Sequence, residues 1–283
     1  LRISQHSIHW QDLAPLLDGP TRVSLSPEAK KAIRDSHKVL KKIISSGQQV
    51  YGVNTGFGKL STVSIGPDDL KQLQLNLVRS HACGVGKPLD LGVTRITMVL
   101  KLMTWAKGYS GVRPKLAQLL VGMLNHDILP VIPRQGSVGA SGDLAPLAHM
   151  ARAMIGEGDV HFQDRIMPAL LALKEANLEP TILEAKEGLS LINGTQVSTA
   201  LGIRALSESH KILETADIAG ALSAEASLST RVVFIPKIHK LKKHPGQVAS
   251  ATNVYNLLKG SDIVQSHDDC GRIQDPYCIR CIP

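Results

Sequence analysis

Apolar residues recur every three or four positions over much of the chain, which is the spacing of an amphipathic helix. The pattern predicts helices over residues 67–79, 93–109 and 114–124, and one long helical run over 190–229. Ser26-Pro27 marks another helix start, because serine caps a helix and proline suits its first position. At 67–69, acidic residues that complement exposed amides mark a start as well. Strand-like runs are short, the clearest being residues 128–133. The chain is therefore predicted to be mainly α.

Composition indicates a folded protein with two regions. Of 283 residues, 43% are apolar and 20% charged, which is typical of globular chains. Residues 156–187 are rich in turn formers, so we predict a mixed N-terminal region over 1–188 and a helical-bundle region over 189–283. No apolar stretch is long enough to span a bilayer, and the residues from Leu1 onward do not have the basic-then-apolar pattern of a leader, which predicts a soluble, cytoplasmic protein with no membrane partner.

The formal charge of +8 raises the question of an anionic partner. The positive residues are dispersed, apart from one lysine cluster at Lys237, Lys240, Lys242 and Lys243. Nucleic-acid binders add stacking aromatics or a known module to such a patch, and neither accompanies this one. We therefore predict a solvated surface segment and no nucleic-acid partner.

Four cysteines are too few for a disulfide framework in a chain of this length. Cys278 and Cys281 have the spacing of a metal or redox pair, but a zinc site requires a second pair of ligands and a redox site requires a βαβ setting. We predict no metal site, and reduced, partly buried thiols.

The stretch GSVGASGDLAPLAHM, residues 136–150, places three glycines before an apolar helix. A phosphate loop would need a Gly-Lys-Ser/Thr triplet, and a dinucleotide fingerprint would need a preceding buried strand. Both are missing. A plain turn with Asp143 as the N-cap of the following helix remains open.

A self-modifying backbone is the other open alternative. If the amide nitrogen of Gly142 bonds to the carbonyl carbon of Ala140, a five-membered ring closes around Ser141. Loss of water then leaves an alkene conjugated to the ring carbonyl, a strong electrophile. Glycine at 142 removes the Cβ that would obstruct this approach, and Gly139 gives the preceding chain freedom.

Five blocks in the same order resemble the aromatic amino acid ammonia-lyase family. They are YGVNTGFG, NLVRSHACGVG, GSVGASGDLAPLAHM, KEGLSLINGTQ and QDPYCIRC. The similarity covers nearly the whole chain, and within the family the blocks look most like the histidine-specific members. It implies a mainly α, ammonia-lyase-like fold with a helical-bundle core, incomplete because the family continues for a long stretch beyond the block that ends at Pro283.

The resemblance also implies roles for individual residues. Ala140, Ser141 and Gly142 would form methylidene-imidazolone (MIO), with no external cofactor. Asn193 and Tyr277 would hydrogen-bond around the ring, and Tyr51 would be the base that removes a β-proton.

Substrate recognition is implied at three further positions. Arg280 would hold the substrate carboxylate, for which a planar guanidinium is well shaped, with Gln274 in the same polar network. His81, after Ser80, would lie near the substrate ring, where a polar side chain suits an imidazole or a phenol.

The implied reaction is elimination of ammonia from L-histidine to give urocanate, by a homotetramer whose active sites are completed by neighbouring subunits. Three alternatives stay open: a tyrosine or other aromatic amino acid ammonia-lyase, an aminomutase that uses the same ring, and a catalytically silent fragment.

Overall fold

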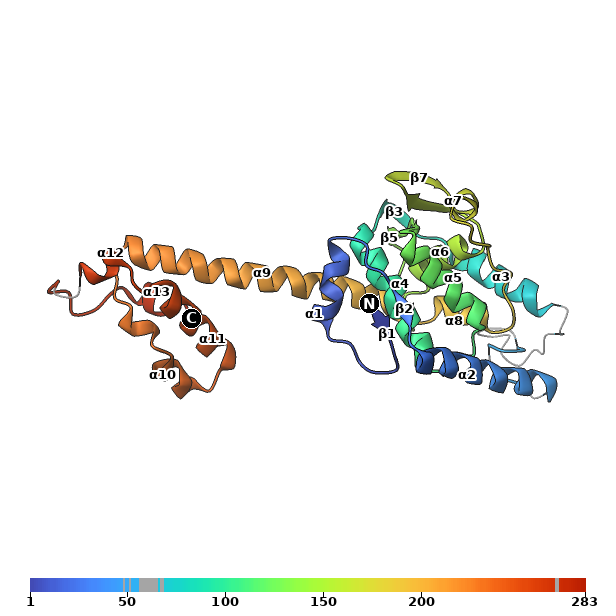
Figure 1. Cartoon of the computed structure of the whole chain (residues 1–283), viewed down its shortest axis with the longest axis horizontal. Coiled ribbons are helices and arrows are strands. Elements are labelled where there is room, and N and C mark those ends of the chain that lie inside the picture. Colours follow the sequence, from blue (N-terminus) through green and yellow to red (C-terminus); the bar gives the residue numbers. More distant parts are fainter. Residues whose placement is uncertain (48, 51, 56–65, 67–68, 268–269) are drawn as a thin grey trace. The chain divides into compact units, whose positions relative to one another are not determined.

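The computed structural model describes residues 1–47, 49–50, 52–55, 66, 69–267 and 270–283. Its helices and strands fall into two compact units, Leu1–Ala205 and Leu206–Pro283, which are treated in turn (Figure 1). The two regions predicted from composition, 1–188 and 189–283, are a separate division of the chain and stay a prediction.

Helices dominate the first unit. They are α1 (Trp10–Leu13), η1 (Ala14–Leu17), α2 (Pro27–Ser45), α3 (Leu70–His81), α4 (Leu91–Ala106), α5 (Pro114–Asn125), α6 (Leu144–Met154), α7 (Ala169–Glu175) and α8 (Glu187–Ile192), followed by the start of α9 (Gln196–Ala226). The mainly α class predicted from the spacing of apolar residues is confirmed.

The strands of the first unit are short. β1 (Arg2–Ile3) pairs in parallel with β2 (Ser24–Leu25), and β3 (Val85–Pro88) pairs antiparallel with β5 (Pro133–Gln135). β4 (Leu129–Pro130), β6 (Asp159–Phe162) and β7 (Arg165–Pro168) form an antiparallel sheet in the order β4-β6-β7. The strand predicted over 128–133 therefore appears as β4 and the start of β5.

The start of α2 follows the local sequence. Ser26 is the N-cap, its hydroxyl accepts the Ala29 N–H at 3.2 Å, and Pro27 is the first helical residue, as predicted. α3 begins at Leu70 after Asp69, whose side chain makes no capping bond. The two residues before Asp69 in the predicted start, Pro67 and Asp68, lie outside the described residues.

The predicted run over 190–229 is wrong as one helix. It is divided into α8 and α9 by three residues, of which Asn193 is extended (ψ 119°) and Gly194 has φ +150°. The apolar spacing continues across the break, so the sequence pattern alone does not reveal it.

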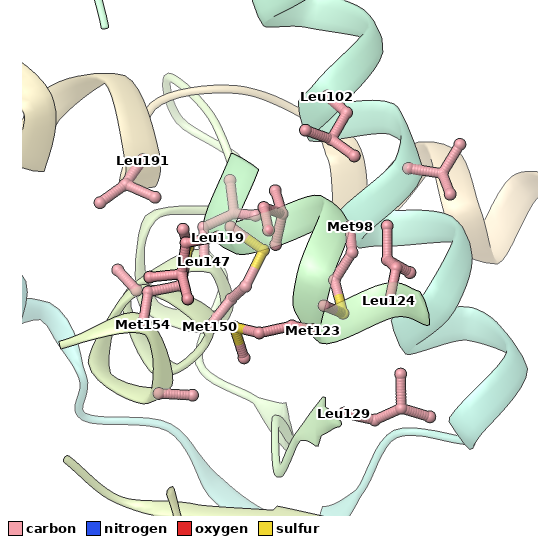
Figure 2. Close-up of a cluster of buried hydrophobic side chains, with 14 of the residues drawn as sticks. Met98, Leu102, Leu119, Met123, Leu124, Leu129, Leu147, Met150, Met154 and Leu191 are labelled. Atoms are coloured by element: carbon pink, nitrogen blue, oxygen red, sulfur yellow. The ribbon is translucent and has the colours of Figure 1, made fainter. Parts of the chain in front are cut away.

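α4 is the centre of the core of the first unit. It is buried on nearly every side and packs against α2, α5 and η1, as a helix that is apolar all round must. Figure 2 shows the adjoining cluster, in which leucines and methionines from α4, α5, α6 and α8 gather. Four of these methionines are completely buried: Met98, Met123, Met150 and Met154. Their flexible side chains fill a core in which aromatic residues are scarce.

The second unit is helical as well. It contains most of α9, then η3 (Val232–Phe234), α10 (Pro236–His239), η4 (Lys240–Lys242), α11 (Pro245–Leu257), α12 (Asp262–Gln265) and α13 (Tyr277–Arg280). A small core centres on Phe234 and Val254, both fully buried. The four clustered lysines at 237–243 are exposed, as predicted for a surface segment.

Among the described residues, none of the helices combines the length and the apolar character that a bilayer crossing requires.

Candidate active site

The glycine-rich loop leads from β5 into α6. Residues 136–141 are exposed, whereas Gly142 and Asp143 are buried. Gly139 has φ +65° and Gly142 has φ +133°, backbone conformations that favour glycine. The loop therefore presents Ala140 and Ser141 at the surface and anchors itself through Gly142.

Gly142 packs against the break between α8 and α9. A methyl group added at Gly142 would lie 2.8 Å from the carbonyl oxygen of Gly194, 3.0 Å from the Gly194 nitrogen and 3.3 Å from Asn193 Oδ1. The next amide, that of Asp143, donates to the same Gly194 carbonyl at 2.7 Å. Only glycine fits position 142 beside the Asn193–Gly194 backbone. Ring closure between residues 140 and 142 also requires a residue without a Cβ at this position.

Asp143 does not cap α6 with its side chain, which is the alternative that the sequence left open. It stands before α6, but its side chain makes no capping bond there. Instead the buried carboxylate accepts the Ser198 N–H at 2.7 Å, the Ser198 hydroxyl at 2.6 Å and the Ser137 hydroxyl at 3.1 Å. It thus caps the first turn of α9, where a negative charge is favourable. The expectation of a cap for α6 is corrected, because a partner 55 residues away outcompetes the local amides.

Lys101 contacts the end of α8 at the same break, and the sequence pattern did not predict it as a site residue. This α4 lysine is fully buried, and its Nζ donates to the carbonyl oxygens of Ser190 (3.3 Å) and Asn193 (3.4 Å). Burial lowers the pKa of Lys101 to about 7, although the negative charge of Asp143 partly opposes this shift. A lysine within the apolar stretch TMVLKLMTW was the available signal.

Asn193 is the C-cap of α8, and its side-chain oxygen faces Gly142 at the distance given above. α8 itself is held at its other end by Arg113, which donates from Nε (2.9 Å) and Nη2 (2.7 Å) to the buried carboxylate of Glu187. This bidentate pair fixes the short helix that presents Asn193.

His81 ends α3, and its Nδ1 lies 2.8 Å from the Leu77 carbonyl oxygen. Gly84, shortly after it, donates its N–H to His149 Nε2 at 3.0 Å. Gly84 also lies against the start of the loop, with its Cα 3.0 Å from the position of a methyl group on Gly136. The structure therefore brings the end of α3 to the base of the glycine-rich loop.

The second unit contains the other predicted site residues. With the Gln274 amide oxygen turned toward Arg280, that oxygen accepts from Nη2 at 2.6 Å and from Nη1 at 3.3 Å. Both residues line a cavity of about 560 Å³, together with Arg272. Arg280 Nε is buried and has no hydrogen-bond partner among the described residues. Tyr277 is exposed at the start of α13. Arg272 pairs with Asp275, which also lines the cavity, at 3.4 Å, and a guanidinium is suited to a carboxylate.

Two further predictions concern Tyr51 and the cysteines. Tyr51 lies outside the described residues. All four cysteines are free, but they are exposed rather than partly buried as predicted, because their segments are loops and helix ends at the surface.

Comparison with known proteins identifies the family and the fold. Residues 8–283 match the family model of aromatic amino acid lyases. A probable histidine ammonia-lyase of Halobacterium salinarum is 48% identical over 261 residues, 92% of this chain and 50% of that protein. The crystal structure of histidine ammonia-lyase from Trypanosoma cruzi has a TM-score of 0.86 at 37% identity, over 99% of this chain and 52% of that chain. Phenylalanine aminomutase from Pantoea agglomerans has a TM-score of 0.90 at 29% identity, covering 99% and 57%.

The fold is that of the ammonia-lyases and aminomutases. The chain belongs to the aromatic amino acid lyase family. It spans about half the length of the relatives it matches.

Proposed function

We propose that the chain is the ring-forming part of a histidine ammonia-lyase, which converts L-histidine to urocanate and ammonia. The observation that carries this proposal is the contact of Gly142 with Gly194, where even a methyl group would come within 2.8 Å of a backbone oxygen. Histidine is favoured as the substrate because the curated relatives with 42–48% identity are histidine ammonia-lyases or a probable one.

Ring closure uses only atoms of this chain. The Gly142 nitrogen bonds to the Ala140 carbonyl carbon, and one water leaves with that carbonyl oxygen and the amide hydrogens of Ser141 and Gly142. A second water takes the Ser141 hydroxyl and its α-hydrogen, which creates the alkene. When formed, methylidene-imidazolone supplies an electron sink that ordinary side chains lack.

The remaining residues bind and orient the amino acid. Arg280 pairs with the substrate carboxylate, and Gln274 holds the guanidinium in place. In the proposed tetramer, where neighbouring subunits complete each active site, His81 contacts the substrate ring, and Asn193 and Tyr277 hydrogen-bond around the electrophile. Tyr51 removes the β-proton, for which its ordinary pKa of about 10 must be lowered by neighbouring donors or positive charge.

The first experiment is an intact-mass measurement of the purified chain. We expect a mass lower than the sequence mass by two molecules of water, with a near-ultraviolet absorbance from the conjugated ring. Ser141→Ala should have its full calculated mass and lack the absorbance. An unmodified wild-type chain would favour the catalytically silent alternative.

Substrate choice is tested by incubating the protein with L-histidine and, separately, L-tyrosine. Urocanate from histidine supports the proposal. Deamination of tyrosine without urocanate assigns the protein to the tyrosine-specific alternative, and a β-amino acid product without free ammonia identifies an aminomutase.

We also propose assembly as a homotetramer. α9 exposes apolar side chains that require a covering partner: Leu201, Leu206, Ile212, Leu213, Ile218 and Leu222. Light scattering coupled to gel filtration measures the mass of the assembly, and a monomer would contradict this proposal. A cytoplasmic location stays a prediction.

A further inference from the structure

Lys101 occupies a position at which a charged residue is costly. It is fully buried in α4, and among the described residues it forms no ion pair. Its hydrogen-bond acceptors are two main-chain carbonyls, at 3.3 and 3.4 Å, which is longer than usual for such bonds. An apolar residue of similar volume at such a site is often neutral or stabilising. Fold stability therefore does not explain why a lysine stands here.

The two carbonyls belong to the end of α8. Ser190 O and Asn193 O are among the last acceptors of that helix, and Trp105 Nε1, one turn further along α4, donates to the same Ser190 oxygen at 3.4 Å. Helix carbonyl ends carry partial negative charge, which an amine donor complements. α4 thus holds the end of α8 through two side chains.

The opposite side of the same peptide faces the glycine-rich loop. Asn193 O and Gly194 N belong to one planar peptide group. Its oxygen accepts from Lys101, whereas its nitrogen lies 3.0 Å from the position of a methyl group on Gly142. Any displacement of this rigid group at the Lys101 side is transmitted to the Gly142 side.

We propose that Lys101 is a positioning residue for ring formation, which holds the Asn193–Gly194 peptide so that it keeps Gly142 close to Ala140. Lys101 contacts neither Ala140 nor Gly142. It acts through the Asn193–Gly194 peptide, which lies between Lys101 and Gly142. The inference rests on the proposed function, because it concerns the same self-modification. The opposing negative charge of Asp143 favours the ammonium form at this site.

The first test follows ring formation in newly made chain by intact mass and ring absorbance. Lys101→Met keeps the length and apolar stem but lacks the donor. Met98→Ala is the matched control, since it opens a cavity one turn away in the same helix without removing a hydrogen-bond donor to α8. We expect ring formation to slow by about 100-fold or more in Lys101→Met, with an unchanged or higher melting temperature. Met98→Ala should have a lower melting temperature and form the ring normally.

The outcomes separate the two proposals. A wild-type chain that never loses water overturns the proposed function and this inference together. A wild-type chain that loses water while Lys101→Met does so at the same rate overturns only the inference.

A second measurement does not depend on the ring. In a Ser141→Ala background, amide hydrogen exchange reports the bond from Asp143 N–H to Gly194 O (2.7 Å). We expect Lys101→Met to lower protection of the Asp143 amide about ten-fold or more. The Leu147 amide, bonded to Asp143 O at 3.0 Å within α6, is the internal control and should keep its protection. Equal protection of the Asp143 amide with and without Lys101 would overturn the positioning role.

Discussion

The carboxylate of Asp143 joins the starts of two helices by binding Ser198. One carboxylate oxygen accepts the Ser198 N–H at 2.7 Å and the other accepts the Ser198 hydroxyl at 2.6 Å. Asp143 directly precedes α6, and Ser198 lies in the first turn of α9. Because Gly142 is the neighbouring residue, these two bonds also fix the end of the Ala140–Gly142 tripeptide.

Ser198→Ala is expected to destabilise the first unit by about 1–3 kcal/mol, because a buried carboxylate loses one of its donors. Chemical unfolding monitored by circular dichroism measures this change. Thr199→Ala is the matched control: the adjacent hydroxyl is exposed and, among the described residues, bonds only to the Thr195 carbonyl just before α9. Its effect should stay within about 0.5 kcal/mol. Equal effects of the two substitutions would contradict the role of Ser198.

Gly142→Ala is expected to abolish ring formation. The added methyl group would lie 2.8 Å from the Gly194 carbonyl oxygen, and φ +133° is unfavourable for alanine. The loop must therefore move away from Gly194. Intact mass should show a chain that has lost no water. Gly47→Ala is the control, because that glycine also has positive φ (+71°) but open space around it. It should cost about 1 kcal/mol of stability and leave the mass change intact.

Arg280→Lys is expected to raise KM for L-histidine about ten-fold with a smaller change in kcat. Lysine keeps the charge but loses the planar fork that bonds the Gln274 oxygen and matches a carboxylate. Steady-state kinetics of urocanate formation measure both constants. Lys242→Gln removes an exposed charge from the same unit and should leave KM unchanged. A loss confined to kcat would contradict carboxylate binding by Arg280.

His149 predicts a loss of stability in mild acid. Its Nε2 accepts the Gly84 N–H, so this nitrogen must be unprotonated, and burial together with the nearby positive charge of Arg152 lowers the pKa of His149. A lowered pKa in the folded state means that the unfolded chain binds more protons. This contribution is present above the ordinary value of 6.5 and is lost as the pH falls through the lowered pKa.

The measurement is the free energy of unfolding of wild type and His149→Gln between pH 8 and pH 5. We expect wild type to lose more stability than the variant on acidification. His126→Gln, an exposed histidine, is the matched control. Parallel curves for wild type and His149→Gln would contradict this prediction.

Local chemistry made part of the fold predictable from the sequence. The start of α2 at Ser26-Pro27 needs only its own first turn, and α5 begins at the proline of its predicted range. The break at Asn193 could not be predicted in this way, because the apolar spacing continues through it. It is stabilised by Lys101, 92 residues away in the chain, and by the loop at Gly142.

Only the part of the candidate site that depends on neighbouring residues could be predicted from the sequence. The Ala140–Gly142 tripeptide is a local motif, and the ring chemistry proposed for it depends on the residue types at three adjacent positions. Asp143 and Lys101 act over long sequence separations, on Ser198 and Asn193, which no pattern in one sequence reveals. The apolar stretch around Lys101 singles this residue out, but because buried lysines are rare the stretch does not by itself predict a buried amine.

Lys101 finally predicts an alkaline gain in stability. Burial lowers the pKa of its amine from 10.5 to about 7 in the folded chain. Between these pH values the unfolded chain binds the additional proton, so the free energy of unfolding rises with pH, and the gain is lost again as the pH falls toward 7. Relative to Lys101→Met, wild type should gain as much as about 1.4 kcal/mol per pH unit over this interval. Lys41→Met, which removes an exposed charge from α2, is the matched control. Identical pH dependence of wild type and Lys101→Met would mean that the amine keeps its ordinary pKa, and that water or a carboxylate reaches it in the folded protein.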